Sequence, residues 1–185
     1  MPERLILASA SPQRRAILAQ VGIPFDVRPA DVEEDAEGDP VVVAEANARR
    51  KAVALDEPGP VLGADTVVAV DGAILGKPED ERQAREFLEL LAGRTHEVVG
   101  GFAIAEGGDV VVAGVEKTAV TFRPATPGLI DWYVGTGEWR GRAGGYAIQG
   151  AGAVLVSGIE GDYLNVVGLP LARLLDLRPD LLPAV

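Results

Sequence analysis

The sequence predicts an α/β protein in which strands and helices alternate along a chain of 185 residues. Short apolar runs, such as residues 4–8 and 61–70, are typical of buried strands. In three places a capping residue is followed directly by proline, which is a common way for a helix to begin. Between residues 84 and 91 the apolar side chains recur with helical spacing. Together these patterns favour a sheet that packs against helices.

The first elements are a strand, a helix and a second strand. Residues 4–8 are almost entirely apolar and lead to Ser11-Pro12, which can serve as the cap and first residue of a helix. Ile17 and Leu18 fall on one face of that helix, and Gly22 ends it. Residues 25–28 follow as the second strand.

An acidic loop at residues 31–39 leads to the second helix. This helix begins at Asp39-Pro40 and runs through Ala54. The apolar strand at 61–70 follows, and its end at Asp71-Gly72 is a strong hairpin signal that leads into a short strand at 73–75.

The amphipathic helix at 84–91 ends at Gly93. Two strands are expected after it, at 96–105 and 110–122, and they are joined through a turn that contains two glycines. Thr126-Pro127 begins a further helix in the same way as the earlier ones.

The last part of the chain contains a glycine-rich segment at 141–152. We expect a strand at 153–157 and a final helix at 165–177. Pro170 lies within that helix and is an alternative start for it, because proline cannot continue a helix but is well tolerated at its first turn.

Composition limits the class of protein. The length fits one domain over 1–185, and a hydrophobic content of 48% excludes a disordered chain. The net charge of −11 disfavours binding to a nucleic acid polymer or an anionic membrane. The sequence has no Cys and one His, His96, so disulfides, thiolate zinc sites and multi-histidine sites are excluded. No apolar run approaches the ~20 residues of a membrane span, so we expect a cytoplasmic protein.

Four segments carry candidate functional residues, although each also has a purely structural interpretation. Ser9 and Ser11 at a strand-to-helix junction, with Arg14 in the first turn, could bind a phosphate or could be an ordinary helix cap. Asp65 interrupts an apolar strand, where a carboxylate needs a partner, a proton or a metal. The alternative is a strand-end aspartate that bonds to nearby backbone.

The other two segments are basic or rich in glycine. Lys77, after the hairpin, and Lys51, in the second helix, could face either an anion or solvent. The glycines of residues 144–150 could let backbone approach a ligand whose base edge Gln149 reads, or could form a tight turn. His96 is interpreted as a hydrogen-bonded core residue. The P-loop, dinucleotide-binding, zinc-protease and serine-hydrolase motifs are absent from the sequence.

Taken together, these segments resemble the Maf family of septum-formation-inhibitor-like nucleotide pyrophosphatases, and the resemblance covers nearly the whole chain. The motifs that carry it are LILASASPQRRAIL at 5–18, VEE at 32–34, ARRKA at 48–52, LGADTVV at 62–68, GKP at 76–78, LAGRTHEVVGG at 91–101, AGGYAIQG at 143–150 and NVVGLPL at 165–171. The resemblance implies a twisted mixed β-sheet flanked by helices, with two lobes around a cleft, similar to inosine triphosphatases.

The resemblance also implies an activity and a set of site residues. The family cleaves a nucleoside triphosphate between its α- and β-phosphates with a divalent cation, Mg²⁺ or Mn²⁺, and is thought to clear unwanted nucleotides. Asp65 matches the catalytic carboxylate. The positions that match phosphate and metal handling are Ser9, Ser11, Arg14, Lys51, Lys77 and either Glu33 or Glu34. The family is often dimeric.

Base choice in the family is associated with three positions, occupied here by Gln13, Thr66 and Gln149. The branch that acts on dTTP and UTP typically has Arg, Thr and Gln there, so Gln13 is the departure and pyrimidine triphosphates are favoured. The alternatives are a 7-methyl-GTP or other modified-nucleotide specificity, and a non-catalytic nucleotide-binding regulator of cell division. A plain structural subunit would neither bind nor hydrolyse nucleotides.

Overall fold

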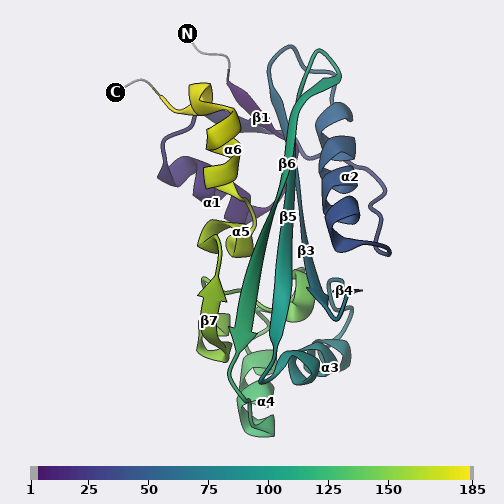
Figure 1. Ribbon diagram of the computed structural model, residues 1–185, viewed down its shortest axis with the longest axis vertical. Helices are drawn as coiled ribbons and strands as arrows, with labels where there is room; N and C mark the ends of the chain where they lie inside the picture. Colours follow the sequence, from purple (N-terminus) through teal and green to yellow (C-terminus); the bar gives the residue numbers. More distant parts are fainter. Residues whose placement is uncertain (1–3, 184–185) are drawn as a thin grey trace.

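The computed structural model describes residues 4–183 and contains one mixed sheet (Figure 1). Within these residues the sheet order is β2-β1-β3-β5-β6-β7, and β4 pairs with β3. The strands are β1 (Leu5–Leu7), β2 (Phe25–Val27), β3 (Val61–Val70), β4 (Ala73–Leu75), β5 (Thr95–Glu106), β6 (Asp109–Phe122) and β7 (Val156–Glu160). The α-helices are α1 (Pro12–Gln20), α2 (Pro40–Val53), α3 (Glu81–Leu91), α4 (Pro127–Gly135), α5 (Tyr163–Val167) and α6 (Leu171–Leu177).

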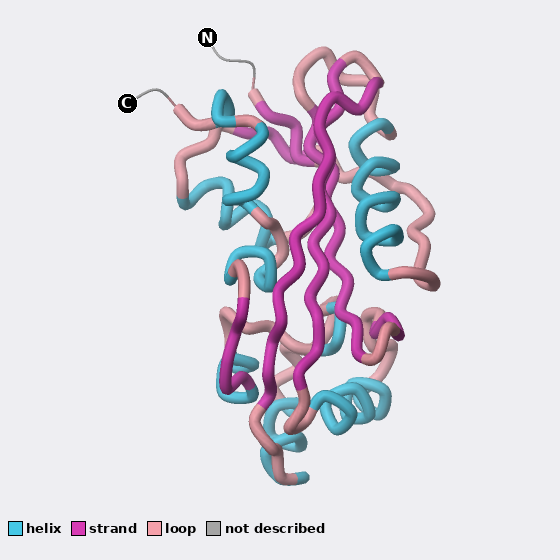
Figure 2. Tube along the Cα trace, viewed as in Figure 1, coloured by secondary structure: helices cyan, strands magenta, loops and turns pink. Residues whose placement is uncertain are grey.

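The sheet is parallel at one edge and antiparallel elsewhere. β1 lies parallel to both β2 and β3, whereas the β3–β5, β5–β6 and β6–β7 pairs are antiparallel. The long strands β3, β5 and β6 run along most of the molecule, with α2 on one side of them and α1, α5 and α6 on the other (Figures 1 and 2). The expected α/β class, with a mixed sheet flanked by helices, is confirmed.

Two glycines allow α2 to lie unusually close to the sheet. A Cβ at Gly63 of β3 would lie 2.1 Å from the Ala48 carbonyl oxygen, and one at Gly101 of β5 would lie 2.2 Å from the Ala44 carbonyl oxygen. No side chain fits in that space, so strand and helix backbones meet directly. Residues on the inner face of α2 are therefore placed within reach of β3.

The interior is divided into two main clusters along the sheet, which accounts for the two expected lobes. One cluster surrounds α3 and α4 and includes Tyr133, Trp139 and Phe122. The other lies under α1 and α6 and includes Leu18 and Phe102. The strands β3 and β5 contribute to both clusters, so the same sheet connects them.

Two expected boundaries are wrong near the C-terminus. The strand expected at 153–157 begins later, as β7, because a 3₁₀ turn at Ala151–Leu155 precedes it. The helix expected at 165–177 is two helices, separated by Gly168 with a φ of 146°. Pro170 lies at the N-cap of α6, as the alternative start predicted. In the described part of the chain no helix is long and apolar enough to cross a membrane.

His96 is a core residue, as expected. Its side chain is 2% exposed, and its Nε2 lies 2.8 Å from the Tyr146 hydroxyl. The ring also packs edge-on against Phe122, with the centroids 5.0 Å apart. Burial lowers the pKa of His96 to about 4, because the cationic ring would lose its hydration without gaining a counterion.

This burial predicts acid sensitivity that one substitution should reduce. The folded-state pKa lies below the unfolded value of about 6.5, so between these values the unfolded chain binds more protons and folding weakens as the pH falls. The His96 contribution is fully present above pH ~6.5, and its loss approaches roughly 3 kcal/mol near pH 4. We expect His96→Gln to show a shallower decline than the wild type in urea unfolding at pH 7, 5.5 and 4.5. Parallel declines in both proteins would assign the acid sensitivity to the carboxylates instead.

Candidate active site

The candidate site lies at a gap in the sheet beside β3. β1 pairs with β3 only as far as Leu62, and β4 begins to pair with it at Val68. Over residues 63–67 this edge of β3 therefore has no neighbouring strand. A cleft of about 530 Å³ lies along the gap, a size typical of small-molecule sites. It is lined by Ala8, Ser9, Ala10, Ser11, Pro12, Gln13, Arg14, Pro29, Ala30, Glu34, Lys51, Asp65, Thr66, Val68, Lys77, Val98, Arg140, Gly141, Arg142, Ala143, Tyr146, Ala147, Gln149, Val166, Val167 and Gly168.

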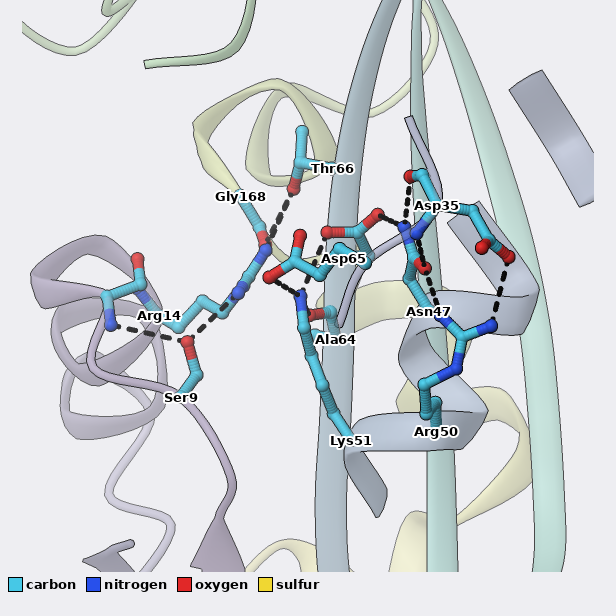
Figure 3. A network of polar contacts seen from close by, with 12 residues as sticks. Ser9, Arg14, Asp35, Asn47, Arg50, Lys51, Ala64, Asp65, Thr66 and Gly168 are labelled. Carbon is cyan, nitrogen blue, oxygen red and sulfur yellow. Dashed lines mark hydrogen bonds and ion pairs between the residues drawn. The ribbon is translucent and has the colours of Figure 1, made fainter. Parts of the chain in front are cut away.

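Asp65 is held at this gap by two side chains of α2 (Figure 3). Asn47 donates to Asp65 Oδ2 at 2.9 Å, and the Lys51 ammonium donates to Oδ1 at 3.0 Å. Asn47 and Lys51 are four residues apart and so share one face of the helix. Lys51 also donates to the Ala64 carbonyl at 3.2 Å. The buried carboxylate is therefore paired, as its position in an apolar strand requires.

The acidic loop before α2 places Glu34 beside the Lys51 ammonium. Asn47 bonds both backbone groups of Asp35, and Arg50 donates to the Glu33 carbonyl oxygen at 2.7 Å. Between these anchors, Glu34 Oε1 lies 3.0 Å from Lys51 Nζ. Of the two glutamates expected at the site, Glu34 lines the cleft and Glu33 does not.

The opposite face of β3 carries Thr66 and a second polar cluster (Figure 3). Successive strand residues point to opposite faces, and Thr66 accordingly faces α1 rather than α2. The buried Arg14 donates to Thr66 Oγ1 at 3.2 Å, to Ser9 Oγ at 2.9 Å and to the Gly168 carbonyl oxygen at 2.9 Å. Burial lowers the pKa of Arg14 below its ordinary value, and the charges of Asp65 and Glu34 oppose that shift. The guanidinium stays protonated because its intrinsic pKa is so high.

Ser11 and the two glutamines lie on the α1 side of the cleft. Ser11 is the N-cap of α1, as expected, and its hydroxyl donates to Gln13 Oε1 at 3.0 Å. Gln13 and Gln149 both line the cleft and also a smaller, mainly apolar cavity of about 280 Å³ beside it. Two of the three residues expected to influence base choice therefore lie where the two cavities meet. The third is Thr66, whose hydroxyl accepts from Arg14 and donates to the Gly168 carbonyl oxygen.

The cleft is positive although the chain is acidic. Five cationic residues line it against two carboxylates, on a chain with a net charge of −11. Arg14 and Lys51 are occupied by the contacts above. Lys77, which is exposed, and Arg142, which is half-buried, make no ion pair or side-chain hydrogen bond within residues 4–183. These two cations are therefore available to an anionic ligand.

The two carboxylates of the cleft, Asp65 and Glu34, suit a magnesium-type ion only if a bound substrate supplies further oxygen atoms to it. No group of three or more His, Cys, Asp or Glu side chains that could hold a metal occurs within the described residues. Asp65 and Glu34 both contact Lys51 Nζ, at 3.0 Å in each case. Mg²⁺ is commonly bound by one or two carboxylates, with substrate phosphates and water completing its shell. The donor set fits an ion that arrives with a phosphorylated substrate.

The structure adds residues that the sequence did not single out. Asn47 is the second partner of Asp65, and its spacing of four from Lys51 was the signal that could have found it. Arg140 and Arg142 reach the cleft from the turn after α4. Nothing in their sequence distinguished them from other surface arginines.

Comparisons with known proteins agree with these motifs. The family model described as "Maf-like protein" matches residues 4–179. A dTTP/UTP pyrophosphatase from Pyrococcus furiosus is 48% identical over 182 residues, 95% of this chain and 94% of the relative. A dTTP/UTP pyrophosphatase from Symbiobacterium thermophilum is 48% identical over 180 residues, 95% of this chain and 92% of the relative.

A more distant likeness was found among solved structures. A HAM1 protein from Coxiella burnetii is 16% identical, with a TM-score of 0.44 over 64% of this chain and 71% of that one. The family assignment depends instead on the motif match and on the close relatives, which both extend over nearly the whole sequence. The chain belongs to the Maf family.

Proposed function

We propose that this protein is a nucleoside triphosphate pyrophosphatase that acts preferentially on dTTP and UTP. The observation that carries the proposal is Asp65, held between Asn47 and Lys51 at the open edge of β3 inside a positive cleft. Relatives with 44–48% identity named dTTP/UTP pyrophosphatases support the reaction and the base. The cytoplasm, where nucleoside triphosphates are made and used, is the compartment we propose for it.

The site residues have two roles in the proposed reaction, which are to accept a proton and to stabilise negative charge. Asp65 accepts a proton from the attacking water, because each of its oxygens keeps a free lone pair beside the bond it already accepts. The water oxygen forms the new bond to phosphorus, and the P–O bond between the α- and β-phosphates breaks. Pyrophosphate leaves with the electron pair of that bond, and Lys77 and Arg142 stabilise its negative charge.

A divalent cation, Mg²⁺ or Mn²⁺, belongs to this proposal, with Asp65 and Glu34 as its protein ligands. When bound, it would neutralise phosphate charge and help to orient the substrate. Lys51 keeps the two carboxylates together at the gap. Because both contact one ammonium, the two carboxylates lie near each other at the open edge of β3.

A substrate panel with the products identified tests the reaction. We expect purified protein with Mg²⁺ or Mn²⁺ to release pyrophosphate and a nucleoside monophosphate from UTP and dTTP. The panel includes CTP, the purine triphosphates and 7-methyl-GTP. Release of orthophosphate would indicate cleavage at the γ-phosphate and contradict the proposal. Binding without any release would favour a nucleotide-binding regulator.

Gln13 gives a separate prediction about base choice. Its amide has both a donor and an acceptor, whereas the arginine typical of the dTTP and UTP branch only donates. We expect Gln13→Arg to shift the ratio of kcat/KM for UTP over ATP toward UTP by roughly fivefold or more, the size of one gained or lost hydrogen bond. Ala19→Arg, which adds the same charge on the exposed side of α1, is the control. Equal ratios in all three proteins would remove Gln13 from the residues that determine specificity.

A further inference from the structure

A half-buried carboxylate outside the cleft, Glu138, holds the turn that carries Gln149. Glu138 follows α4, and its Oε1 accepts the backbone N–H of Ala151 at 2.9 Å. Its Oε2 accepts the N–H of Gly152 at 2.9 Å and the hydroxyl of Tyr133 at 2.9 Å. One side chain thus satisfies three donors, two of them on consecutive backbone groups.

These bonds replace a local cap that the turn lacks. The 3₁₀ segment Ala151–Leu155 begins after Gly150, which has no side chain to bond the free N–H groups. Glu138 supplies the acceptors from 13 and 14 residues away in the sequence. A Cβ at Gly150 would lie 1.8 Å from Glu138 Oε1, so the absence of a side chain at Gly150 makes room for the carboxylate.

Tyr133 extends the same contact to the other end of the turn. Its hydroxyl accepts the N–H of Ala147 at 3.1 Å while it donates to Glu138. Burial raises the pKa of Tyr133, and the hydrogen bond to Glu138 raises it further, so the hydroxyl keeps its proton. The 147–152 turn is therefore hydrogen-bonded to Tyr133 before Gln149 and to Glu138 after it.

We propose that Glu138, together with Tyr133, positions Gln149 and so determines discrimination at the pyrimidine base edge. Neither residue lines the cleft, so they are positioning residues that act through the 147–152 turn. The proposal rests on the proposed function in that it takes Gln149 as the side chain that reads the base. A glutamine at 138 has one acceptor oxygen, so its amide group would face a donor that the carboxylate now satisfies.

The test compares UTP with CTP, which share sugar and phosphates and differ at the base edge. We expect Glu138→Gln and Tyr133→Phe each to lower the UTP/CTP ratio of kcat/KM by about three- to tenfold, the effect of one weakened hydrogen bond. The change should lie mainly in KM, because Asp65 and its partners are untouched. Glu89→Gln, on the exposed side of α3, is the matched control and should leave the ratio unchanged.

A double-variant cycle shows whether the effect passes through Gln149. In a Gln149→Ala background, Glu138→Gln should cause no further change in the ratio. If Glu138→Gln and Tyr133→Phe only lower the melting temperature and leave the ratio as in the wild type, the proposal is overturned. It is also overturned if Gln149→Ala alone leaves the ratio unchanged.

Calorimetric binding of UMP and CMP separates this proposal from the reaction itself. If no triphosphate yields pyrophosphate, the proposed function fails, and the UMP/CMP affinity ratio of the same variants still decides the role of Glu138. An affinity ratio that falls in both variants supports positioning, and one that does not change contradicts it.

Discussion

Asp65→Asn is expected to lower kcat for pyrophosphate release by ~10²-fold or more while the protein stays folded. The amide keeps the size of the carboxylate but cannot accept the proton of the attacking water. The new side chain also turns an NH₂ group toward either Asn47 or Lys51, which both donate to Asp65. A modest fall in the free energy of unfolding should therefore accompany the loss of activity.

The measurement is initial-rate pyrophosphate release with UTP, alongside a thermal unfolding curve. Asp176→Asn, an exposed aspartate on α6, makes the same chemical change away from the cleft and should have wild-type activity. If Asp65→Asn retained near-normal turnover, the role of proton acceptor would pass to Glu34, the other carboxylate in the cleft.

Lys51→Met should reduce both activity and stability. The substitution leaves Asp65, Glu34 and the Ala64 carbonyl oxygen without their shared donor. Breaking a buried charge pair by removing one partner costs about 3 kcal/mol or somewhat more. Because Glu34 is partly exposed, most of this destabilisation should come from Asp65. We expect a loss of kcat comparable to that of Asp65→Asn.

A double variant distinguishes charge from packing. Lys51→Met combined with Asp65→Asn removes both members of the pair, so it should recover part of the stability but none of the activity. Arg49→Met is the control, since Arg49 lies on the same helix in an exposed pair with Glu45 and should contribute less than about 1 kcal/mol. Equal stability of Lys51→Met and the double variant would show that the unpaired Asp65 carboxylate is not the cause of the destabilisation.

The fold was predictable where the sequence carried local signals. Caps at Ser11, Asp39 and Thr126 begin α1, α2 and α4 at the expected prolines. The two failures near the C-terminus have different causes. The break between α5 and α6 lies at Gly168 and Pro170, so the local signal was present in the sequence, whereas a contact distant in sequence determines where β7 begins. The 3₁₀ turn that delays β7 is capped by Glu138, which no pattern within 150–157 reveals.

The site was predictable as a set of residues but not as a network. The resemblance selected Arg14, Lys51 and Asp65, and the structure brings them to one cleft. It could not show that Arg14 is bonded to Thr66, Ser9 and the Gly168 carbonyl oxygen, because these partners converge from separate segments. The choice between Glu33 and Glu34 depended on the anchoring of the acidic loop by Asn47 and Arg50, which is likewise a tertiary contact.

The long strands also limit how the cleft can change shape during turnover. β5 stays paired with β3 from Ala105 to Glu97 and with β6 over nearly its whole length, so one ladder passes through both main core clusters. A hinge between the two ends of the molecule would have to bend or break that ladder, since hinges form where a few loop or element-end residues absorb the motion. We therefore expect entry of the nucleotide and escape of its products to involve only the rim loops and side chains, around an active site that keeps its shape throughout the catalytic cycle.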